Sequence, residues 1–183
     1  MDWGSDGIDV TGSGFATVYG ISTNGGTDTA TMNGSAGTDK FYGRETYGLM
    51  QNVGGTDYYH YAGGFITVTA AGGGGADTAY LYGSTSSDTL DVSPGVASMA
   101  RAGSATSEAN DFATVFGLAE VGGTDTATMT GSAGPDVFYG RETSGLMQDV
   151  GGTDYYHYAR DFSTVTAEGG GGADTAYLYD SAG

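Results

Sequence analysis

The feature of this sequence that most constrains its fold is an internal repeat. Residues 15–82 align with residues 112–179 at an offset of 97, and 54 of the 68 aligned positions are identical. Segments such as GGTDTATM, FYGRET and VGGTDYYHYA occur once in each copy. A chain that repeats itself this closely is expected to build a stack of similar units, each of which buries its apolar face against its neighbours.

A shorter period divides the long repeat. Large apolar residues at expected strand starts are 22 to 26 residues apart, and acids that follow glycine-rich turns alternate with them. The apolar series is Phe15, Phe41, Phe65, Leu90, Phe112, Phe138 and Phe162, and the acidic series is Asp28, Asp57, Asp77, Glu108, Asp125, Asp154 and Asp174. This period predicts two strands in every unit of about 25 residues, with Phe15, Phe41 and Phe65 piled in one column.

The composition and the local pattern both favour β-structure. The 183 residues include 36 glycines, which disfavour helices, and many threonines and tyrosines, which favour strands. Residues after each acid alternate with a period of two, which predicts one buried and one exposed face. The face predicted to be buried carries Ala30, Met32, Tyr59, Tyr61, Ala79, Leu81, Ala127, Met129, Tyr156, Tyr158, Ala176 and Leu178. The face predicted to be exposed carries Thr29, Thr31, Tyr58, His60, Thr78 and Tyr80.

These patterns predict an all-β fold, a right-handed parallel β-helix (β-solenoid) of about seven rungs of about 25 residues, nested in the 97-residue repeat. We expect a single domain over residues 1–183, with one repeat at 15–111 and an incomplete one at 112–183. Residues 1–14 are expected to be the end of a preceding rung. The alternative fold is a β-sandwich, which also has short strands and frequent turns.

The charge excludes several classes of partner. The sequence contains 22 acidic and 5 basic residues, and its formal net charge is −17. Such a surface does not attract phosphates, so no nucleic-acid partner is expected. No membrane insertion is expected either, because no apolar run approaches the length of a membrane span. The absence of cysteine excludes disulfides and thiolate metal sites.

Several turns combine glycine or serine with aspartate in the order that calcium-binding turns use. Gly72–Asp77 and Gly169–Asp174 fit the pattern GGxGxD, and the turns before Phe41, Leu90 and Phe138 fit it in part. This pattern resembles the nonapeptide repeat of secreted bacterial repeats-in-toxin proteins, a resemblance that implies Ca²⁺ bound by aspartate and by turn carbonyls. The candidate metal ligands are Asp77, Asp174, Asp39, Asp136, Asp88, Asp28 and Asp125. The turn aspartates are 11 residues apart within a pair, whereas the family spaces them by 9 or 18.

A second interpretation of the same aspartates needs no metal. An aspartate beside glycine commonly accepts backbone N–H bonds and so stabilises its own turn. The sequence alone leaves capping and calcium binding open.

Aromatic residues suggest a glycan-binding surface. If they lie outside, the repeated tyrosines and histidines form a stripe along one sheet beside acidic residues, an arrangement that suits stacking against sugars. The candidates are Tyr58, His60, Tyr80, Tyr155, His157 and Tyr177. The simpler alternative is that they cover a sheet face.

The threonines of TATM segments are similar to the Thr-x-Thr strands of ice-binding solenoids. The expected intervening strands carry tyrosine and histidine, which would interrupt such an array.

Catalysis has little support, because no nucleophile–base signature is present and both histidines lie in repeated strands. We therefore expect no enzyme.

Together these features predict a non-enzymatic structural or assembly module of a large, acidic, extracellular bacterial protein, such as an adhesin, a matrix protein or a surface filament. The resemblance to secreted β-solenoid proteins implies the extracellular or cell-surface location. We expect self-association, end to end or with neighbouring repeats, and a glycan is a second candidate partner. The alternative functions are a carbohydrate-binding or polysaccharide-acting β-helix and, third, an ice-binding solenoid.

Overall fold

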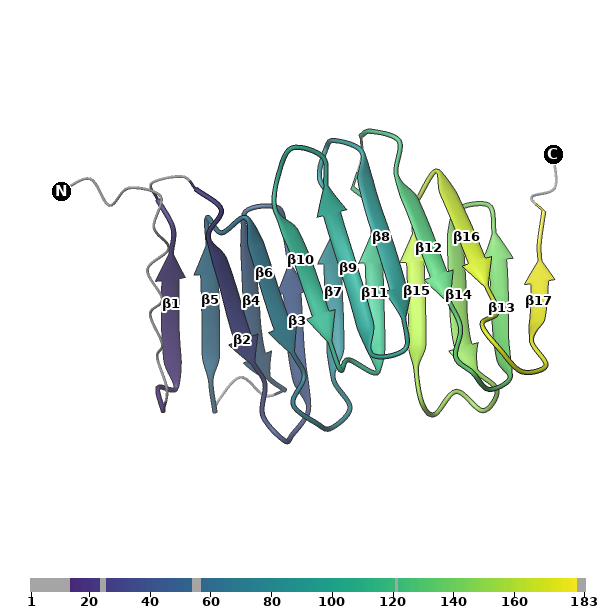
Figure 1. Cartoon of the computed structure of the whole chain (residues 1–183), viewed down its shortest axis with the longest axis horizontal. Helices are drawn as coiled ribbons and strands as arrows, with labels where there is room; N and C mark the ends of the chain where they lie inside the picture. The colour runs from purple at the N-terminus through teal and green to yellow at the C-terminus, as the bar shows by residue number, and fades with distance from the viewer. Residues whose placement is uncertain (1–13, 24–25, 54–56, 121, 181–183) are drawn as a thin grey trace.

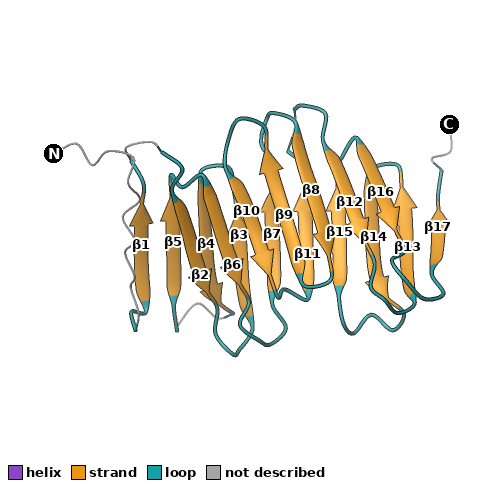
Figure 2. Cartoon of the chain, viewed as in Figure 1, coloured by secondary structure: helices purple, strands orange, loops and turns teal. Residues whose placement is uncertain are grey.

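A computed structural model of the chain contains two facing β-sheets and describes residues 14–23, 26–53, 57–120 and 122–180. Figure 1 shows the strands lying across the long axis of the molecule in two layers, with the first and the last strand at opposite ends. In the described residues every regular element is a strand (Figure 2), and no helix could span a membrane. Residues 1–13 lie outside the described part, so the expected end of a preceding rung at residues 1–14 stays a prediction.

The two sheets differ in size. Sheet A has ten strands, in the spatial order β1 (Thr17–Ile21), β5 (Tyr59–Gly63), β4 (Tyr47–Asn52), β3 (Asp39–Gly43), β7 (Thr78–Tyr82), β11 (Thr114–Leu118), β15 (Tyr156–Arg160), β14 (Ser144–Asp149), β13 (Asp136–Arg141) and β17 (Thr175–Leu178). Sheet B has seven strands, in the order β2 (Thr29–Asn33), β6 (Thr67–Ala71), β10 (Thr106–Asn110), β9 (Val96–Arg101), β8 (Asp88–Ser93), β12 (Thr126–Thr130) and β16 (Thr164–Glu168).

The chain crosses between the sheets repeatedly, and between crossings it also folds back within one sheet. Three antiparallel meanders do this: β3–β4–β5 and β13–β14–β15 in sheet A, and β8–β9–β10 in sheet B. The remaining strand pairs among the described residues are parallel, as in β3 with β7 and β12 with β16. The fold is therefore a β-solenoid with antiparallel meanders inserted in its turns.

The spacing of the stacked strands differs from the predicted one. Thr78 pairs with Thr114, 36 residues later, and Thr17 pairs with Tyr59, 42 residues later. The solenoid has about four turns, so the prediction of about seven rungs of about 25 residues was wrong. The reason is that some of the predicted strands belong to meanders, which widen a sheet by hairpins without adding a turn of the coil.

The 97-residue repeat is visible as a unit of architecture. Strand β1 and its repeat equivalent β11 occupy the first and sixth positions of sheet A. Strands β2 and β12 occupy the first and sixth positions of sheet B. Each repeat unit therefore spans five strands of each sheet, and the next unit continues both sheets in the same direction.

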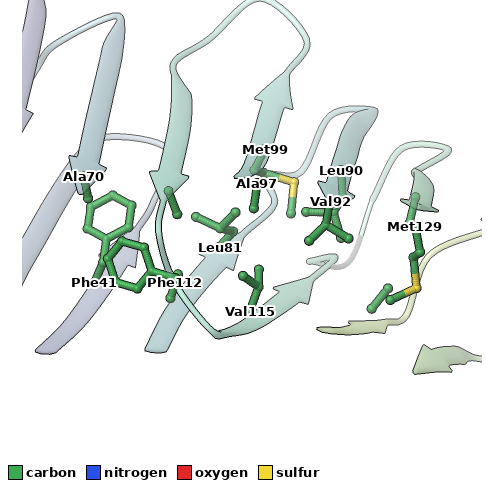
Figure 3. Packing of buried hydrophobic residues seen from close by; sticks show 14 of the residues in the cluster. Phe41, Ala70, Leu81, Leu90, Val92, Ala97, Met99, Phe112, Val115 and Met129 are labelled. Atoms are coloured by element: carbon green, nitrogen blue, oxygen red, sulfur yellow. The ribbon is translucent and has the colours of Figure 1, made fainter. Parts of the chain in front are cut away.

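The core lies between the sheets and follows the predicted alternation in the strands that cross from sheet to sheet. Ala79 and Leu81 of β7 and Met129 of β12 are fully buried, whereas Thr29 and Thr31 of β2 are exposed. Figure 3 shows such side chains filling the space between the layers. The predicted faces of β7 and β12 are confirmed, whereas Ala176 and Leu178 of β17, which were predicted to be buried, are exposed.

The predicted column of phenylalanines does not form. Phe41 lies in β3 of sheet A and is fully buried, with its ring centroid 6.2 Å from that of Phe112. Phe65 is only partly buried and precedes β6 of sheet B, and Phe15 is 65% exposed. Their even spacing in the sequence therefore does not correspond to a stack, because Phe41 lies in a strand of sheet A and Phe65 lies in the connection from β5 to β6.

The YYHYA strands show the opposite faces to those predicted. Tyr155, just before β15, and His157 and Ala159 within it point into the core, whereas Tyr156 and Tyr158 lie on the outer face. The chain enters β15 from a loop within sheet A rather than from a sheet crossing. A shift of one residue at such an entry exchanges the two faces of a strand.

A buried arginine links the two sheets. Arg101, at the end of β9, donates hydrogen bonds to the carbonyl oxygen of Tyr82 in sheet A at 2.8 Å and 2.6 Å and to that of Gly43 at 3.1 Å. It also donates to the carbonyl oxygen of Ala105 at 2.8 Å and to Oγ of Ser107 at 3.1 Å. Burial lowers the pKa of Arg101 to about 10, and these acceptors compensate for its lost hydration.

The burial of His157 leads to a prediction about pH. Its ring is fully buried, neither ring nitrogen has a hydrogen-bond partner, and burial lowers its pKa from 6.5 to about 4. As the pH falls from 6.5 towards 4, His157 is therefore protonated in the unfolded chain but stays neutral in the folded chain. We expect this single group to cost about 3 kcal/mol of folding free energy over that range.

Urea unfolding of the wild type and of His157→Phe between pH 7 and pH 4 measures this effect. Between pH 7 and pH 4 the wild type should lose about 3 kcal/mol more of its free energy of unfolding than His157→Phe, because only the wild type loses stability through this group. His60→Phe, at the equivalent position of β5, is the matched control for the same substitution in a ring that is only partly buried. Parallel pH profiles for the wild type and His157→Phe would contradict the expectation.

Candidate functional site

The turn aspartates share one local geometry. In five turns a glycine stands five residues before the aspartate, and the carboxylate lies against the glycine Cα. These turns are Gly34–Asp39, Gly72–Asp77, Gly83–Asp88, Gly131–Asp136 and Gly169–Asp174. A Cβ on Gly83 would lie 2.5 Å from Oδ2 of Asp88, so only glycine leaves room for the carboxylate.

Three of these carboxylates accept hydrogen bonds from a serine four residues earlier. Oδ2 of Asp39 accepts the backbone N–H of Ser35 at 2.6 Å, and the Ser35 hydroxyl donates to the same carboxylate at 3.1 Å. Ser84 and Ser132 make the same contacts with Asp88 and Asp136. Each of these aspartates thus caps the turn that leads into its own strand.

The capped turns are linked in pairs across neighbouring parallel strands. Oδ1 of Asp77 accepts the backbone N–H of Asp39 at 2.7 Å, and Oδ1 of Asp125 accepts that of Asp88 at 2.8 Å. Asp174 accepts the backbone N–H of Asp136 at 3.0 Å in the same way. The predicted site residues are therefore brought together as three pairs, two in sheet A and one in sheet B.

Asp28 stands outside these pairs. It is half-buried and its Oδ2 accepts the hydroxyl of Ser22 at 2.6 Å. It is the equivalent of Asp125 in the preceding repeat unit.

Burial makes two of the carboxylates unusual. Asp77 and Asp125 are nearly inaccessible to solvent, and burial raises the pKa of both. Oδ2 of Asp77 has no hydrogen-bond partner. Burial and the nearby carboxylate of Asp39 raise the pKa of Tyr58, and Asp136 has the same effect on Tyr155. These phenols stay protonated at neutral pH.

The turn carboxylates already act as hydrogen-bond acceptors. Ca²⁺ takes six to eight oxygen ligands. In the described parts of the chain, no group of three or more acidic or histidine side chains is arranged to hold a metal ion. The carboxylate oxygens of Asp39, Asp88 and Asp136 already accept N–H and O–H donors, and a cation there would have to displace those donors.

The six aromatic residues predicted to bind glycan do not form one surface. Tyr155 and His157 are buried, and their repeat counterparts Tyr58 and His60 are partly buried on the same inner side of β5. The two remaining candidates, Tyr80 of β7 and Tyr177 of β17, lie on the outer face of sheet A.

That outer face carries a row of large side chains which the sequence did not reveal. One residue from each strand of sheet A takes part: Tyr19, Tyr61, Leu49, Tyr42, Tyr80, Phe116, Tyr158, Leu146, Tyr139 and Tyr177. The ring of Tyr80 stacks on Tyr42 at 5.2 Å and on Phe116 at 5.1 Å, with interplanar angles of 9° and 10°. Such rings cover one another's faces, so this part of the row presents ring edges rather than sugar-stacking faces to solvent.

Two arginines extend the same face. The guanidinium of Arg44 lies 3.8 Å from the ring centroid of Tyr82 and makes a 3.9 Å ion pair with Glu120. Its counterpart Arg141 lies 5.2 Å from the ring centroid of Tyr179. These contacts are cation–π packing on a sheet surface.

The outer face of sheet B is rich in threonine. Six of the seven residues in one row are threonines: Thr29, Thr67, Thr106, Ala100, Thr89, Thr126 and Thr164. The adjacent row reads Thr31, Thr69, Glu108, Ser98, Asp91, Thr128 and Thr166. The tyrosine- and histidine-bearing strands that were expected to interrupt this array lie in sheet A. The interruption that does exist is the meander β8–β9–β10, which contributes Ala100, Ser98 and two acids.

One shallow cleft of about 350 Å³ lies beside the second repeat unit. Its lining includes Phe112, Asp111, Asp149, Asp154 and Tyr155. Asp149 already accepts hydrogen bonds from the backbone N–H groups of Asp154 and Tyr155. The cleft thus offers turn carboxylates engaged in local bonds, and the hydroxyl of its lining residue Ser132 donates to Asp136 at 3.0 Å.

Comparison of the chain with protein-family models, with curated proteins and with solved structures found no match.

The capping role predicts a large difference between two aspartates of one strand. Asp88 is buried and accepts two hydrogen bonds, whereas Asp91, three residues later in β8, is exposed. Asp88→Ala should lower the free energy of unfolding by roughly 2–4 kcal/mol, since it leaves buried donors without an acceptor. Asp91→Ala should change it by less than about 0.5 kcal/mol. Denaturant unfolding of both variants measures the difference, and equal effects would contradict the capping role.

Proposed function

We propose that this chain is a non-enzymatic structural module, a stiff segment of β-solenoid that extends or assembles a larger acidic protein outside the cell. The module would act as a rigid, continuous spacer and not as a catalyst. Adhesins, matrix proteins and surface filaments need such segments, because a rigid spacer holds a binding end at a fixed distance from its base.

The observation that carries this proposal is the repeat unit itself. Strands β1 and β2 recur as β11 and β12, five positions further along each sheet. Each unit therefore buries its apolar face against the next unit, and the ladder of hydrogen bonds continues along the axis. A stack built in this way can be lengthened without changing its interior.

The charge is consistent with this role. The formal net charge of −17 keeps a rod soluble and prevents nonspecific lateral clustering. The extracellular location rests on the resemblance of the glycine–aspartate turns to those of secreted repeat proteins.

The calcium hypothesis has a direct test. Because the turn carboxylates accept backbone N–H bonds, we expect the folded rod to hold without a metal. The melting temperature, followed by circular dichroism, should be the same in excess chelator and in millimolar CaCl₂.

A fall of the melting temperature in chelator that CaCl₂ reverses would show that Ca²⁺ binds the folded state and would overturn the capping account. Asp77→Asn then identifies the site, since Oδ2 of Asp77 is the buried carboxylate oxygen without a hydrogen-bond partner. MgCl₂ at the same ionic strength is the control for nonspecific charge screening.

The carbohydrate-binding alternative keeps little support from the candidate residues. Four of the six lie on the inner side of sheet A, and the ring faces of Tyr80 are covered by Tyr42 and Phe116. A sugar ring would find exposed aromatic surface mainly at the ends of the row, at Tyr19 and Tyr177.

The threonine rows of sheet B support a second candidate function, ice binding. Rows of threonine hydroxyl and methyl groups recur about 4.8 Å apart from strand to strand and about 6.7 Å apart along each strand. A regular array of this kind can hold water in an ordered layer. Its two all-threonine blocks, on β2 with β6 and on β12 with β16, are separated by the β8–β9–β10 meander.

Ice binding predicts measurable thermal hysteresis. Thr126→Tyr, in the middle of the second block, should abolish most of it because the ring disrupts the flat array. Thr78→Tyr places the same ring on sheet A and should leave the hysteresis unchanged. A wild-type protein without thermal hysteresis, or equal effects of the two substitutions, would remove this candidate.

A further inference from the structure

The outer face of sheet A carries most of the positive charge of this acidic chain. The sequence has five basic residues, and one of them, Arg101, is buried between the sheets. Lys40, Arg160 and Arg141 stand in strands of sheet A at positions that alternate with buried residues. Arg44 follows β3 and packs over an aromatic ring of the same face. Successive side chains of a strand point to opposite faces, so these four bases belong to the outer one.

The strands of this face place no acid on it. In the described strands of sheet A the acidic residues are Asp39, Asp136 and Asp149. Asp39 and Asp136 are buried, and Asp149 pairs in register with Asp136 and therefore lies on the same inward side. The chain has 22 acidic residues, so a strand surface with bases and without acids is a local exception.

The outer face of sheet B has the opposite charge. Asp91 of β8, Glu108 of β10 and Glu168 of β16 lie on it. The one basic residue in the described strands of sheet B is the buried Arg101. The two outer faces lie on opposite sides of the molecule (Figure 1). They are complementary in charge and can meet only between two molecules.

The charges of the two faces also have the same spacing. On sheet A, Arg160 and Arg141 lie in one row across the strands, because both pair with the same residue of β14 between them. On sheet B, Glu108 and Asp91 lie in one row, because both pair with the same residue of β9. Each pair is two strand positions apart, which is about 9.6 Å at the usual distance between neighbouring strands.

We propose that a second copy of this chain docks on the outer face of sheet A through the outer face of its own sheet B. In this contact Arg160 and Arg141 of one copy lie opposite Glu108 and Asp91 of the other. The inference rests on the proposed assembly role and names a lateral contact surface for it. Each copy has both faces, so the contact can repeat and gives a side-by-side array of solenoids.

The charged side chains of both rows are accessible. Arg160, Arg141 and Asp91 are exposed, and Glu108 is partly buried. Arg160 also makes a 3.1 Å ion pair with its neighbour Asp161, in which about half of each side chain is exposed, and a surface pair of this kind contributes little. Oε2 of Glu108 accepts a threonine hydroxyl at 2.8 Å, which leaves Oε1 to meet a cation.

The contact is staggered along the axis. The two bases stand at strand positions seven and nine of sheet A, in the second repeat unit, and the two acids stand at positions three and five of sheet B, in the first. When the pairs are superposed in either direction, positions five to ten of sheet A face six positions of sheet B. Six strands of about five residues cover roughly 500 Å² on each partner, below the roughly 800 Å² of a standard interface. The association is therefore weak and depends on protein concentration.

Sedimentation velocity in about 0.15 M NaCl tests the contact, because a Debye length of about 8 Å screens much of the repulsion between two acidic molecules. The wild type should associate reversibly as its concentration rises. The base-reversed variant carries Arg141→Glu and Arg160→Glu, and the acid-reversed variant carries Asp91→Lys and Glu108→Lys. Each variant alone should have a dissociation constant raised by about tenfold or more, because attractive pairs become repulsive.

An equimolar mixture of the two variants gives the sharpest result. The new glutamates of the base-reversed variant meet the new lysines of the acid-reversed variant, and the two unaltered faces also meet. The mixture should therefore recover the association of the wild type, although neither variant associates well with itself.

A matched control separates this contact from the effect of net charge. Glu45→Lys with Asp154→Lys changes two exposed acids outside both rows and alters the net charge as much as the acid-reversed variant does. This control should associate at least as well as the wild type, because it lowers the repulsion between molecules. The acid-reversed variant lowers that repulsion equally and should nevertheless associate less.

Circular dichroism checks that every variant is folded. Where a reversed variant does not fold, Arg141→Gln with Arg160→Gln, or Asp91→Asn with Glu108→Gln, replaces it and should still weaken association, by a smaller factor.

The opposing results would each overturn the contact. Variants that associate like the wild type, or a mixture that does not recover association, would show that these two rows do not meet. Weakening by the base-reversed variant alone would show that sheet A meets a surface other than sheet B. A wild type that stays monomeric at every concentration would overturn lateral docking and leave the spacer role standing. The frictional ratio of the monomer tests that role separately, since a rigid spacer must be elongated.

Discussion

The solenoid depends on buried carboxylates at the turns where the chain enters its crossing strands. At such a turn several backbone N–H groups leave the ladder and need another acceptor. Asp39 and Asp88 accept the N–H groups of their own turns, and Asp77 and Asp125 accept those of the aspartates in neighbouring strands. The crossings are thereby linked one above another. Burial works against this arrangement, as the raised pKa values of Asp77 and Asp125 indicate, but the hydrogen bonds offset part of that cost.

The sequence predicted the strands that leave these turns and missed the meanders. Alternation after an aspartate put Ala79 and Leu81 inside, where they are fully buried. The same rule applied to the YYHYA segments put His157 outside, although it is fully buried. The β8–β9 hairpin did leave a signal, since Pro94-Gly95 is a turn pair between two strand-like segments. Hairpins pair strands only a few residues apart, so a period counted along the chain cannot give the number of turns of the coil.

Of the candidate site residues, the sequence likewise predicted those defined by local turn chemistry and missed those that only the strand order brings together. All seven aspartates chosen from the sequence lie at turns or strand starts, because glycine–aspartate chemistry is local. A fixed spacing of five residues between glycine and aspartate was available in the sequence and would have separated the carboxylates that pack on a glycine from Asp28 and Asp125. The aromatic row could not be found in this way. It joins residues from Tyr19 to Tyr177, and their adjacency exists only after three meanders have reordered the strands of sheet A.

The composition of the sheet ends is informative because the repeat provides an internal standard. Leu81 and Leu178 stand in identical segments, yet one has no exposed surface and the other is 77% exposed. A terminal edge strand is ordinarily protected by charge, proline or a bulge against pairing with other chains. Strand β17 has none of these within Thr175–Leu178, and β1 has none within Thr17–Ile21. Both strands therefore keep the side-chain chemistry of their interior repeat equivalents, β7 and β11.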